Sequence, residues 1–143
     1  MFRQSLILAP LCLASVTVLA DTQSLVEGAG DVLAAALPLT ALTATFTLDD
    51  SDGRKEFLLS YGTTFVITQI GKYTVDKERP DGSDFRSFPS GHTSSAFSGA
   101  SFLAKRYGWD IGVPAYLAAS FVGYSRVQAD KHDWIDVGTG AVL

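Results

Sequence analysis

Residues 125–136 read SRVQADKHDWID and place His132 four residues before Asp136. At this spacing two side chains share one face of a helix, so the Asp136 carboxylate can contact the His132 ring. A carboxylate that accepts the proton of one imidazole nitrogen fixes the tautomer and leaves the lone pair of the other nitrogen free to attack. The stretch therefore predicts His132 as a nucleophile that Asp136 orients.

Three cations of the chain provide the positive charge that such a nucleophile needs in order to attack a phosphate ester. Phosphoryl transfer depends mainly on positioning and on neutralising the charge of the three equatorial oxygens. Lys72, Arg79 and Arg126 are the candidates for that role. Arg126 or Lys72 alone would be read as an ordinary surface cation, and it is the joint spacing of the three cations with two histidines and a carboxylate that predicts a site.

The sequence Pro89-Ser90-Gly91-His92 predicts the start of a helix and an anion-binding turn. Backbone N–H groups at a helix N-terminus bind anions, and Gly91 lets the backbone come close to one. The Ser90 hydroxyl adds a donor, and Pro89 stiffens the approach. His92 stands on the same turn, where it can protonate a departing alkoxide near neutral pH.

Together these patterns resemble the type 2 phosphatidic acid phosphatase superfamily, whose three sequence blocks all occur here without a substitution. The blocks are a lysine followed by six residues and Arg-Pro, then Pro-Ser-Gly-His, then Ser-Arg-x5-His-x3-Asp. The resemblance covers roughly residues 58–143. It implies that His132 forms a phosphohistidine, that Asp136 orients His132 and that His92 is the general acid. It also implies phosphate binding by Lys72, Arg79, Ser90, Gly91 and Arg126, with support from Pro80, Pro89 and Ser125.

The expected fold is all-α, a helical bundle of about five helices. The helices are expected over about 24–48, 54–72, 91–106 and 111–124, with a fifth that opens around Asp133, and the loops at 49–53, 73–89, 107–110 and 125–131. The final helix is short for its share of a bundle and shows no stop signal before Leu143. This suggests that the chain is a fragment whose last helix is truncated.

The first twenty residues have the pattern of a secretory signal peptide, followed by a single domain over residues 21–143. Arg3 gives the positive start, Leu6 to Leu19 the apolar core, and Val18-Leu19-Ala20 the cleavage site. Two alternatives stay open. The segment could remain as an uncut membrane anchor, although its apolar run is short for a span, or Cys12, the only cysteine, could carry a lipid.

The acidic balance of the chain, with 15 Asp and Glu against 11 Lys and Arg, argues against a nucleic-acid partner. The positive charge is local to the predicted phosphate site. Uncharged stretches at 32–48, 57–71 and 111–124 contain many Thr, Ser and Gly, so soluble helices and short membrane helices both remain possible. The resemblance favours a membrane-associated enzyme of the cell envelope, with its site on the periplasmic side.

The sequence thus predicts a phosphoric ester hydrolase that acts on phosphate monoesters, with lipid phosphates and isoprenoid pyrophosphates among the candidates. It would need no metal or other cofactor, and phosphate or vanadate would fit the site. One alternative is a vanadate-dependent haloperoxidase, which has a similar pocket because vanadate mimics the phosphoryl transition state, although such enzymes are typically much longer. Another is a non-catalytic phosphate-binding envelope protein, against which the intact His132, His92 and Asp136 speak. Selectivity resides in the walls around the phosphate site, so the sequence names neither the ester nor the oligomeric state.

Overall fold

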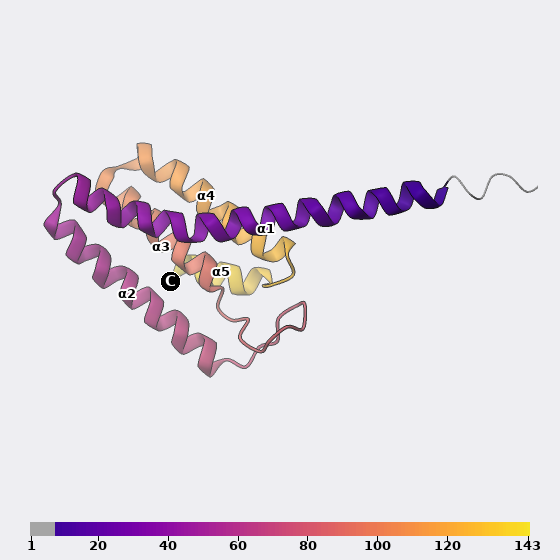
Figure 1. Cartoon of the computed structure of the whole chain (residues 1–143). Coiled ribbons are helices and arrows are strands. Elements are labelled where there is room, and N and C mark those ends of the chain that lie inside the picture. The colour runs from indigo at the N-terminus through magenta and orange to yellow at the C-terminus, as the bar shows by residue number, and fades with distance from the viewer. Residues whose placement is uncertain (1–7) are drawn as a thin grey trace, which may run out of the picture.

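Five helices make up most of the chain in the computed structural model, which describes the backbone of residues 8–143 and the side chains of residues 22–143. Over this range the backbone forms no strand, and a single isolated bridge pairs Lys77 with Arg86. The predicted all-α fold is therefore confirmed. In chain order the helices are α1 (Leu8–Thr47), α2 (Ser51–Thr74), α3 (Gly91–Tyr107), α4 (Trp109–Gln128) and α5 (Trp134–Val142) (Figure 1).

Polar caps fix where three of the helices begin. Asp50 caps α2 by accepting a hydrogen bond from the backbone N–H of Gly53 at 2.9 Å. Ser90 caps α3, and Asp133 caps α5. These side chains satisfy backbone donors that have no partner inside the helix. As a result, the sequence blocks that contain Ser90 and His132 lie at helix starts.

Helix α3 lies at the centre of the bundle and contacts each of the other four helices (Figure 1). Small side chains form these contacts and let the helices approach closely. Ala96 and Ala100 of α3 and Ala119 of α4 are fully buried. Larger side chains fill the core at the end far from the α3 start, where the Phe57 and Phe102 rings meet edge to face with centroids 5.1 Å apart. The start of α3 is therefore held in place from several sides.

Helix α1 begins much earlier than the sequence predicts. Its backbone is helical from Leu8, so the helix runs through the predicted cleavage site rather than beginning near residue 24. Residues 1–7 and the side chains up to Asp21 lie outside the described part of the structure. The division into a leader at 1–20 and a domain at 21–143 stays a prediction.

Helix α4 ends later than predicted, because the expected loop at 125–131 begins only after Gln128. Ser125 and Arg126 are helical and buried. Their polar groups suggest a loop when the chain is considered alone, but in the fold they find partners. The Ser125 hydroxyl donates to the Val122 carbonyl at 2.7 Å, and Arg126 pairs with Asp31 of α1. Tertiary contacts thus extend the helix beyond its apparent sequence limit.

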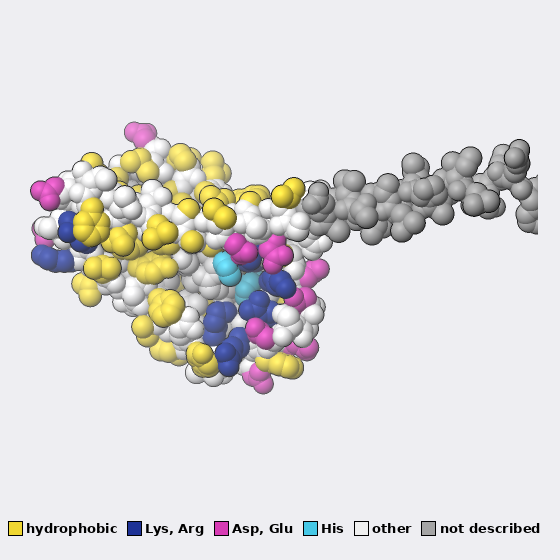
Figure 2. Space-filling view, in the orientation of Figure 1, with side chains coloured by type: hydrophobic (Ala, Val, Ile, Leu, Met, Phe, Trp, Pro, Cys, Tyr) yellow, Lys and Arg dark blue, Asp and Glu magenta, His cyan; other side chains and the backbone are white. Residues whose placement is uncertain are grey.

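Apolar side chains lie exposed along the outward faces of α1, α2 and α4. The exposed fractions are 61% for Leu39 of α1, 73% for Leu59 of α2 and 68% for Leu117 of α4. Figure 2 shows hydrophobic side chains spread over the part of the surface formed by α1 and α2. Among the described helices, Thr22–Thr47 of α1 is the one stretch long and apolar enough to cross a membrane. A single helix of this kind also occurs in soluble bundles and in signal sequences.

Candidate active site

A cavity of about 430 Å³ lies between α1, α2 and the start of α3. Its charged and imidazole groups come from α1, the end of α2, the loop that follows, the first turn of α3 and the loop before α5. Five predicted site residues line it, namely Lys72, Arg79, Gly91, His92 and His132. On the surface, the two histidines lie beside a group of Lys and Arg side chains (Figure 2). The fold therefore brings together residues that are up to 60 positions apart in the sequence.

The remaining predicted residues do not line the cavity. Asp136 stands behind His132, and Ser125 and Arg126 lie on α4 behind His92. The Ser90 hydroxyl pairs with Thr93 Oγ1 at 2.9 Å. Pro89 is buried before α3, and Pro80 is exposed in the α2–α3 loop. The predicted site residues therefore fall into two groups, one that lines the cavity and one that lies behind the lining residues.

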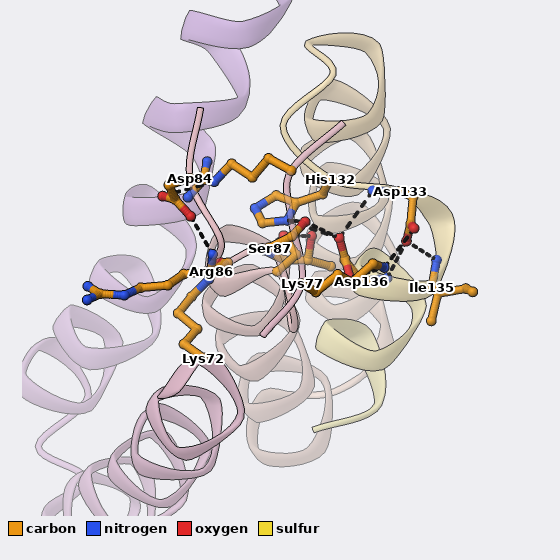
Figure 3. A network of polar contacts seen from close by, with 12 residues as sticks. Lys72, Lys77, Asp84, Arg86, Ser87, His132, Asp133, Ile135 and Asp136 are labelled. Atoms are coloured by element: carbon orange, nitrogen blue, oxygen red, sulfur yellow. Dashed lines mark hydrogen bonds and ion pairs between the residues drawn. The ribbon is translucent and has the colours of Figure 1, made fainter. Parts of the chain in front are cut away.

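His132 is buried, and two oxygen atoms approach its Nδ1 atom (Figure 3). Asp136 Oδ2 lies 3.5 Å from Nδ1, and the Ser87 hydroxyl oxygen lies 3.4 Å from it. Ser87 also donates a short hydrogen bond to Asp136 Oδ2. Because the Ser87 proton goes to the carboxylate, its oxygen can accept from Nδ1–H. This arrangement favours the tautomer in which the His132 Nε2 lone pair is free.

His132 and Asp136 meet through a helix cap rather than through the shared helix face that the sequence predicts. Helix α5 begins at Trp134, so His132 precedes it. Asp133 and Asp136 form a capping box, in which Asp136 Oδ2 accepts a hydrogen bond from the Asp133 N–H at 3.3 Å. The predicted contact occurs, but the capping turn sets its geometry.

Burial and nearby cations keep His132 neutral. Burial is the largest cause, and the positive charges of Lys72 and Arg79 act in the same direction, so the pKa of His132 falls to about 4. The contact with Asp136 raises the pKa but does not offset these effects. At pH 7 the imidazole therefore carries an available lone pair, as a nucleophile requires.

His92 faces Asp31 of α1, a residue that none of the sequence blocks contains. His92 Nε2 lies 3.2 Å from Asp31 Oδ1, and the two side chains are 48% and 49% exposed. Burial and the charge of Arg126 lower the pKa of His92, whereas Asp31 raises it. Both side chains line the cavity. A proton on His92 can therefore pass to a molecule bound there.

Arg126 is held by α1 and is almost fully buried, with 3% of its side chain exposed. Its Nη1 donates to Asp31 Oδ1 at 2.7 Å, and its Nη2 donates to the Glu27 carbonyl at 2.7 Å. Its Nε donates to Ser125 Oγ at 3.2 Å. Arg126 thus meets the cavity through Asp31, and the direct phosphate contact expected of it stays a prediction.

Lys72 and Arg79 keep donors available on the cavity side. Lys72 Nζ donates to the Arg86 carbonyl at 3.0 Å, which leaves two of its three N–H groups. Arg79 Nε lies 3.2 Å from Asp84 Oδ2 without forming a well-aligned hydrogen bond. Burial and the neighbouring charge of Arg79 lower the pKa of Lys72. An anion between these two cations would relieve their repulsion.

Glycines allow the close approaches around the first turn of α3. A Cβ on Gly91 would come within 3.3 Å of Lys72 Cε, so the absence of a side chain leaves room for the lysine. A Cβ on Gly140 of α5 would lie 2.6 Å from the Ser90 carbonyl oxygen. Helix α5 therefore packs directly against the turn that Ser90 and Gly91 form.

Three residues outside the sequence blocks complete the site. They are Asp31, Lys77 and Ser87, and each contacts a predicted residue through a charged group or a hydroxyl. Asp31 had a detectable signal, because it is the only charge between Glu27 and Asp49 in an otherwise apolar stretch. Lys77 and Ser87 had none, since their partner Asp136 is 59 and 49 residues away.

The chemistry of this donor set suits an anion. Two imidazoles and two cations surround the cavity, and backbone N–H groups at the start of α3 add to them. Among residues 22–143, no group of three or more His, Cys, Asp or Glu side chains is arranged to hold a metal ion.

Known proteins are similar to the part of the chain that carries most of this site. The family model described as PAP2 superfamily matches residues 55–143. The chain is 42% identical over 81 residues to the lipid A 1-phosphatase of Porphyromonas gingivalis, an alignment that covers 54% of this chain and 18% of that protein. It is 33% identical over 134 residues to the lipid A 4'-phosphatase of Helicobacter pylori, which covers 83% of this chain and 65% of the relative.

A eukaryotic protein is also similar. The chain is 41% identical over 82 residues to the probable diacylglycerol pyrophosphate phosphatase 1 of Schizosaccharomyces pombe, covering 48% of this chain and 29% of that protein. The chain spans less than two thirds of the length of each of these relatives. No solved structure matches it significantly.

Proposed function

Because the chain belongs to the PAP2 superfamily, we propose that it is a phosphatase that removes a phosphate group from a lipid. The observation that carries the proposal is the convergence of His92, His132, Lys72 and Arg79 on one cavity. The names of the relatives support a lipid substrate, since they are lipid A phosphatases and a probable diacylglycerol pyrophosphate phosphatase. The donor set described above is suited to a phosphoryl group.

In the proposed first step, His132 Nε2 attacks phosphorus and the bond between phosphorus and the ester oxygen breaks. His92 gives its proton to the departing alkoxide, so that a neutral alcohol leaves. Lys72 and Arg79 neutralise the equatorial oxygens, and the N–H groups at the start of α3 add to this stabilisation. The product is a phosphohistidine on His132, oriented from behind by Asp136.

In the second step, water attacks the phosphohistidine, and its proton passes to the now neutral His92. Phosphate leaves, and His132 returns to its neutral form. The low pKa of His132 supports this cycle, because the free imidazole is the leaving group of this step and the nucleophile of the next turnover. The proposed cycle uses no cofactor.

The wall of the cavity supports a substrate with an apolar part next to its phosphate. Ala34 and Ala35 of α1 and Phe65 of α2 line the cavity together with the charged residues. Phe65 is 55% exposed, so the apolar wall continues onto the outer surface of α2. A lipid phosphate could place its headgroup among the cations and its chain along this wall.

We also propose that the bundle associates with a membrane through its apolar surface. The uncharged stretches at 32–48, 57–71 and 111–124 are helical apart from Leu48. At 1.5 Å per residue they extend over about 21–26 Å, compared with a hydrocarbon core of about 30 Å. Charged side chains gather at the two ends of these stretches, and the candidate site lies at one of those ends. A substrate phosphate at the level of lipid headgroups would meet the site there.

The proposed orientation places the site on the outer side of the cytoplasmic membrane, with residues 1–20 acting as an export signal. The pattern of Arg3, the apolar run and the small residue Ala20 supports this. Fusing a reporter that is active only in the periplasm after Leu143 would test it. Reporter activity that disappears when residues 1–20 are deleted is the expected result, and activity that is independent of these residues would contradict it.

The activity is tested with membranes and soluble fractions from cells that express the full chain. The substrates are a lipid A phosphate, phosphatidic acid, diacylglycerol pyrophosphate and a soluble chromogenic phosphate ester. We expect phosphate release from at least one lipid substrate in the membrane fraction. His132→Ala should abolish it, and His92→Ala should reduce turnover mainly for substrates with poor leaving groups. Undiminished turnover by His132→Ala would refute the nucleophile assignment.

A further inference from the structure

Lys77 lies in the loop between α2 and α3, five residues after the lysine of the first sequence block. Its Nζ forms two ion pairs, one with Asp133 Oδ2 and one with Asp136 Oδ1, each at 2.7 Å (Figure 3). Asp136 is the carboxylate behind His132, and its side chain is fully buried. Lys77 is therefore the cation in direct contact with the residue that orients the proposed nucleophile.

The loop is built so that Lys77 and Ser87 reach Asp136 together. The Ser87 N–H donates to the Lys77 carbonyl at 3.0 Å, and the Lys77 N–H donates to the Phe85 carbonyl at 3.3 Å. The two ends of the loop therefore lie side by side. Lys77 donates to Asp136 Oδ1, whereas Ser87 donates to Oδ2, the oxygen that faces His132 Nδ1. Each carboxylate oxygen thus has its own partner.

The charge of Asp136 depends on these partners. Burial raises the pKa of its carboxyl group, but hydrogen bonds from Lys77 and Ser87 bring the pKa below its ordinary value. Burial lowers the pKa of Lys77 in turn, while Asp133 and Asp136 raise it above its ordinary value. A buried carboxylate that loses its only contacting cation tends to take up a proton. A neutral Asp136 would be a weaker hydrogen-bond acceptor for the Nδ1–H of His132 than the carboxylate is.

We propose that Lys77 is a positioning residue for phosphoryl transfer, which keeps Asp136 ionised and directed at His132 while never touching the phosphoryl group itself. Lys77 does not line the cavity, in contrast to Lys72. The two lysines therefore have different roles. Lys72 faces the substrate cavity, whereas Lys77 contacts Asp136 on the far side of His132. This inference rests on the proposed role of His132.

A purely structural role is the competing explanation, because Lys77 also ties its loop to the cap of α5 through Asp133. Lys131 offers a matched control. Its Nζ pairs with Asp81 Oδ2 at 2.7 Å, and its side chain is 32% exposed, compared with 29% for Lys77. This pair also connects the α2–α3 loop to the segment before α5, but the Lys131 amine donates to Asp81 rather than to Asp136. Lys131→Met removes the same charge and the same kind of loop contact.

The experiment compares Lys77→Met, Lys77→Gln, Lys77→Arg and Lys131→Met in the full chain, using the best lipid substrate. We expect Lys77→Met to lower kcat about 10- to 100-fold, as for other groups that orient a reactive histidine from behind, with little change in KM. The acid limb of the kcat profile should move to higher pH, because Asp136 would protonate more easily. Lys77→Arg should restore most of kcat and the acid limb, and Lys131→Met should resemble the wild type. Lys77→Gln gives the same test if Lys77→Met does not fold.

Several results would overturn the inference. One is a Lys77→Met or Lys77→Gln enzyme with the wild-type kcat and acid limb. Another is an equal loss of kcat in Lys131→Met, which would point to loop anchoring alone. His132→Ala separates these failures from failure of the proposed function. If His132→Ala is inactive while the Lys77 variants resemble the wild type, only the inference about Lys77 fails. If His132→Ala is fully active, the proposed role of His132 as the nucleophile fails and the inference about Lys77 fails with it.

Discussion

Gly30→Ala should destabilise the protein and loosen the hold of α1 on Arg126. At Gly30, α1 crosses α4 so closely that an added Cβ would overlap Ser125 Oγ and lie 2.9 Å from Arg126 Nη2. Contacting carbon atoms sit about 3.5–4.0 Å apart, so the helices must separate by roughly 1 Å. Ser125 cannot turn aside without cost, because its buried hydroxyl donates to the Val122 carbonyl and accepts from Arg126 Nε.

The magnitude follows from three contributions. Overpacking of a tight contact costs about 1–3 kcal/mol, and loss of the hydrogen bond between Arg126 and Ser125 costs about 1 kcal/mol. Alanine in place of glycine inside a helix returns about 0.5–1 kcal/mol. The net loss is about 1–3 kcal/mol, which corresponds to a fall in Tm of about 4–10 °C for a chain of this size.

Gly28 provides the control, since it lies two residues earlier on the same helix and a Cβ there would meet nothing within 4 Å. Gly28→Ala should leave Tm unchanged or raise it slightly. The assay is thermal unfolding of the two purified variants and the wild type in the same detergent. If Gly30→Ala melts like Gly28→Ala, the close packing of α1 against Ser125 and Arg126 is wrong.

Two further predictions concern titrating groups. The free energy of unfolding should fall as pH drops from about 6.5 to 4, since His132 takes up a proton near pH 6.5 when unfolded and near pH 4 when folded. The free energy of unfolding should change by an amount on the order of 3 kcal/mol across this range. Urea unfolding at several pH values measures it, and the free energy of unfolding should depend less steeply on pH in His132→Asn. An unchanged dependence on pH would contradict the burial of an uncharged imidazole. Asp31→Asn should move the alkaline limb of kcat/KM to lower pH, because Asp31 raises the pKa of His92. It should also free Arg126 and tighten inhibition by phosphate roughly two- to fivefold, whereas weaker inhibition would show that Asp31 supports phosphate binding.

Asp136 and His132 affect the free energy of unfolding in different pH ranges. Asp136 has a lowered pKa, so the stability it contributes is present above the ordinary carboxyl pKa and is lost only as pH falls further. Protonation of His132 lowers the free energy of unfolding at higher pH, between about 6.5 and 4. A measurement between pH 4 and 6.5 therefore reports mainly on the imidazoles.

The helices and the cavity-facing residues could be predicted because their signals are local. Ser90 and Asp133 are capping residues that mark helix starts, and the motif spacing identified His92 and His132. The end of α4 could not be predicted in this way. Polar residues such as Ser125 and Arg126 normally indicate a loop, and only their partners on other turns and helices keep them helical.

The supporting residues were harder to predict for a related reason. Ser87 and Lys77 act on Asp136 from a loop that is about 50 residues away in the chain, and neither residue has a periodicity or a motif of its own. The sequence assigned the orientation of His132 to Asp136 alone. In the structure Lys77 and Ser87 both donate to Asp136, and a buried carboxylate needs such hydrogen bonds and a counter-charge to stay ionised.

Helix α1 contributes a side chain to the site although it lies outside the family match. The family match covers residues 55–143, but the side chain that contacts both His92 and Arg126 is Asp31. Without α1, the buried guanidinium of Arg126 would lose its ion pair with Asp31 and its hydrogen bond to the Glu27 carbonyl. An unpaired buried cation is costly, so the matched segment alone would have to expose or reorient Arg126 next to His92. Helix α1 is therefore part of the candidate site as well as its cover, and the three sequence blocks are not sufficient to build it.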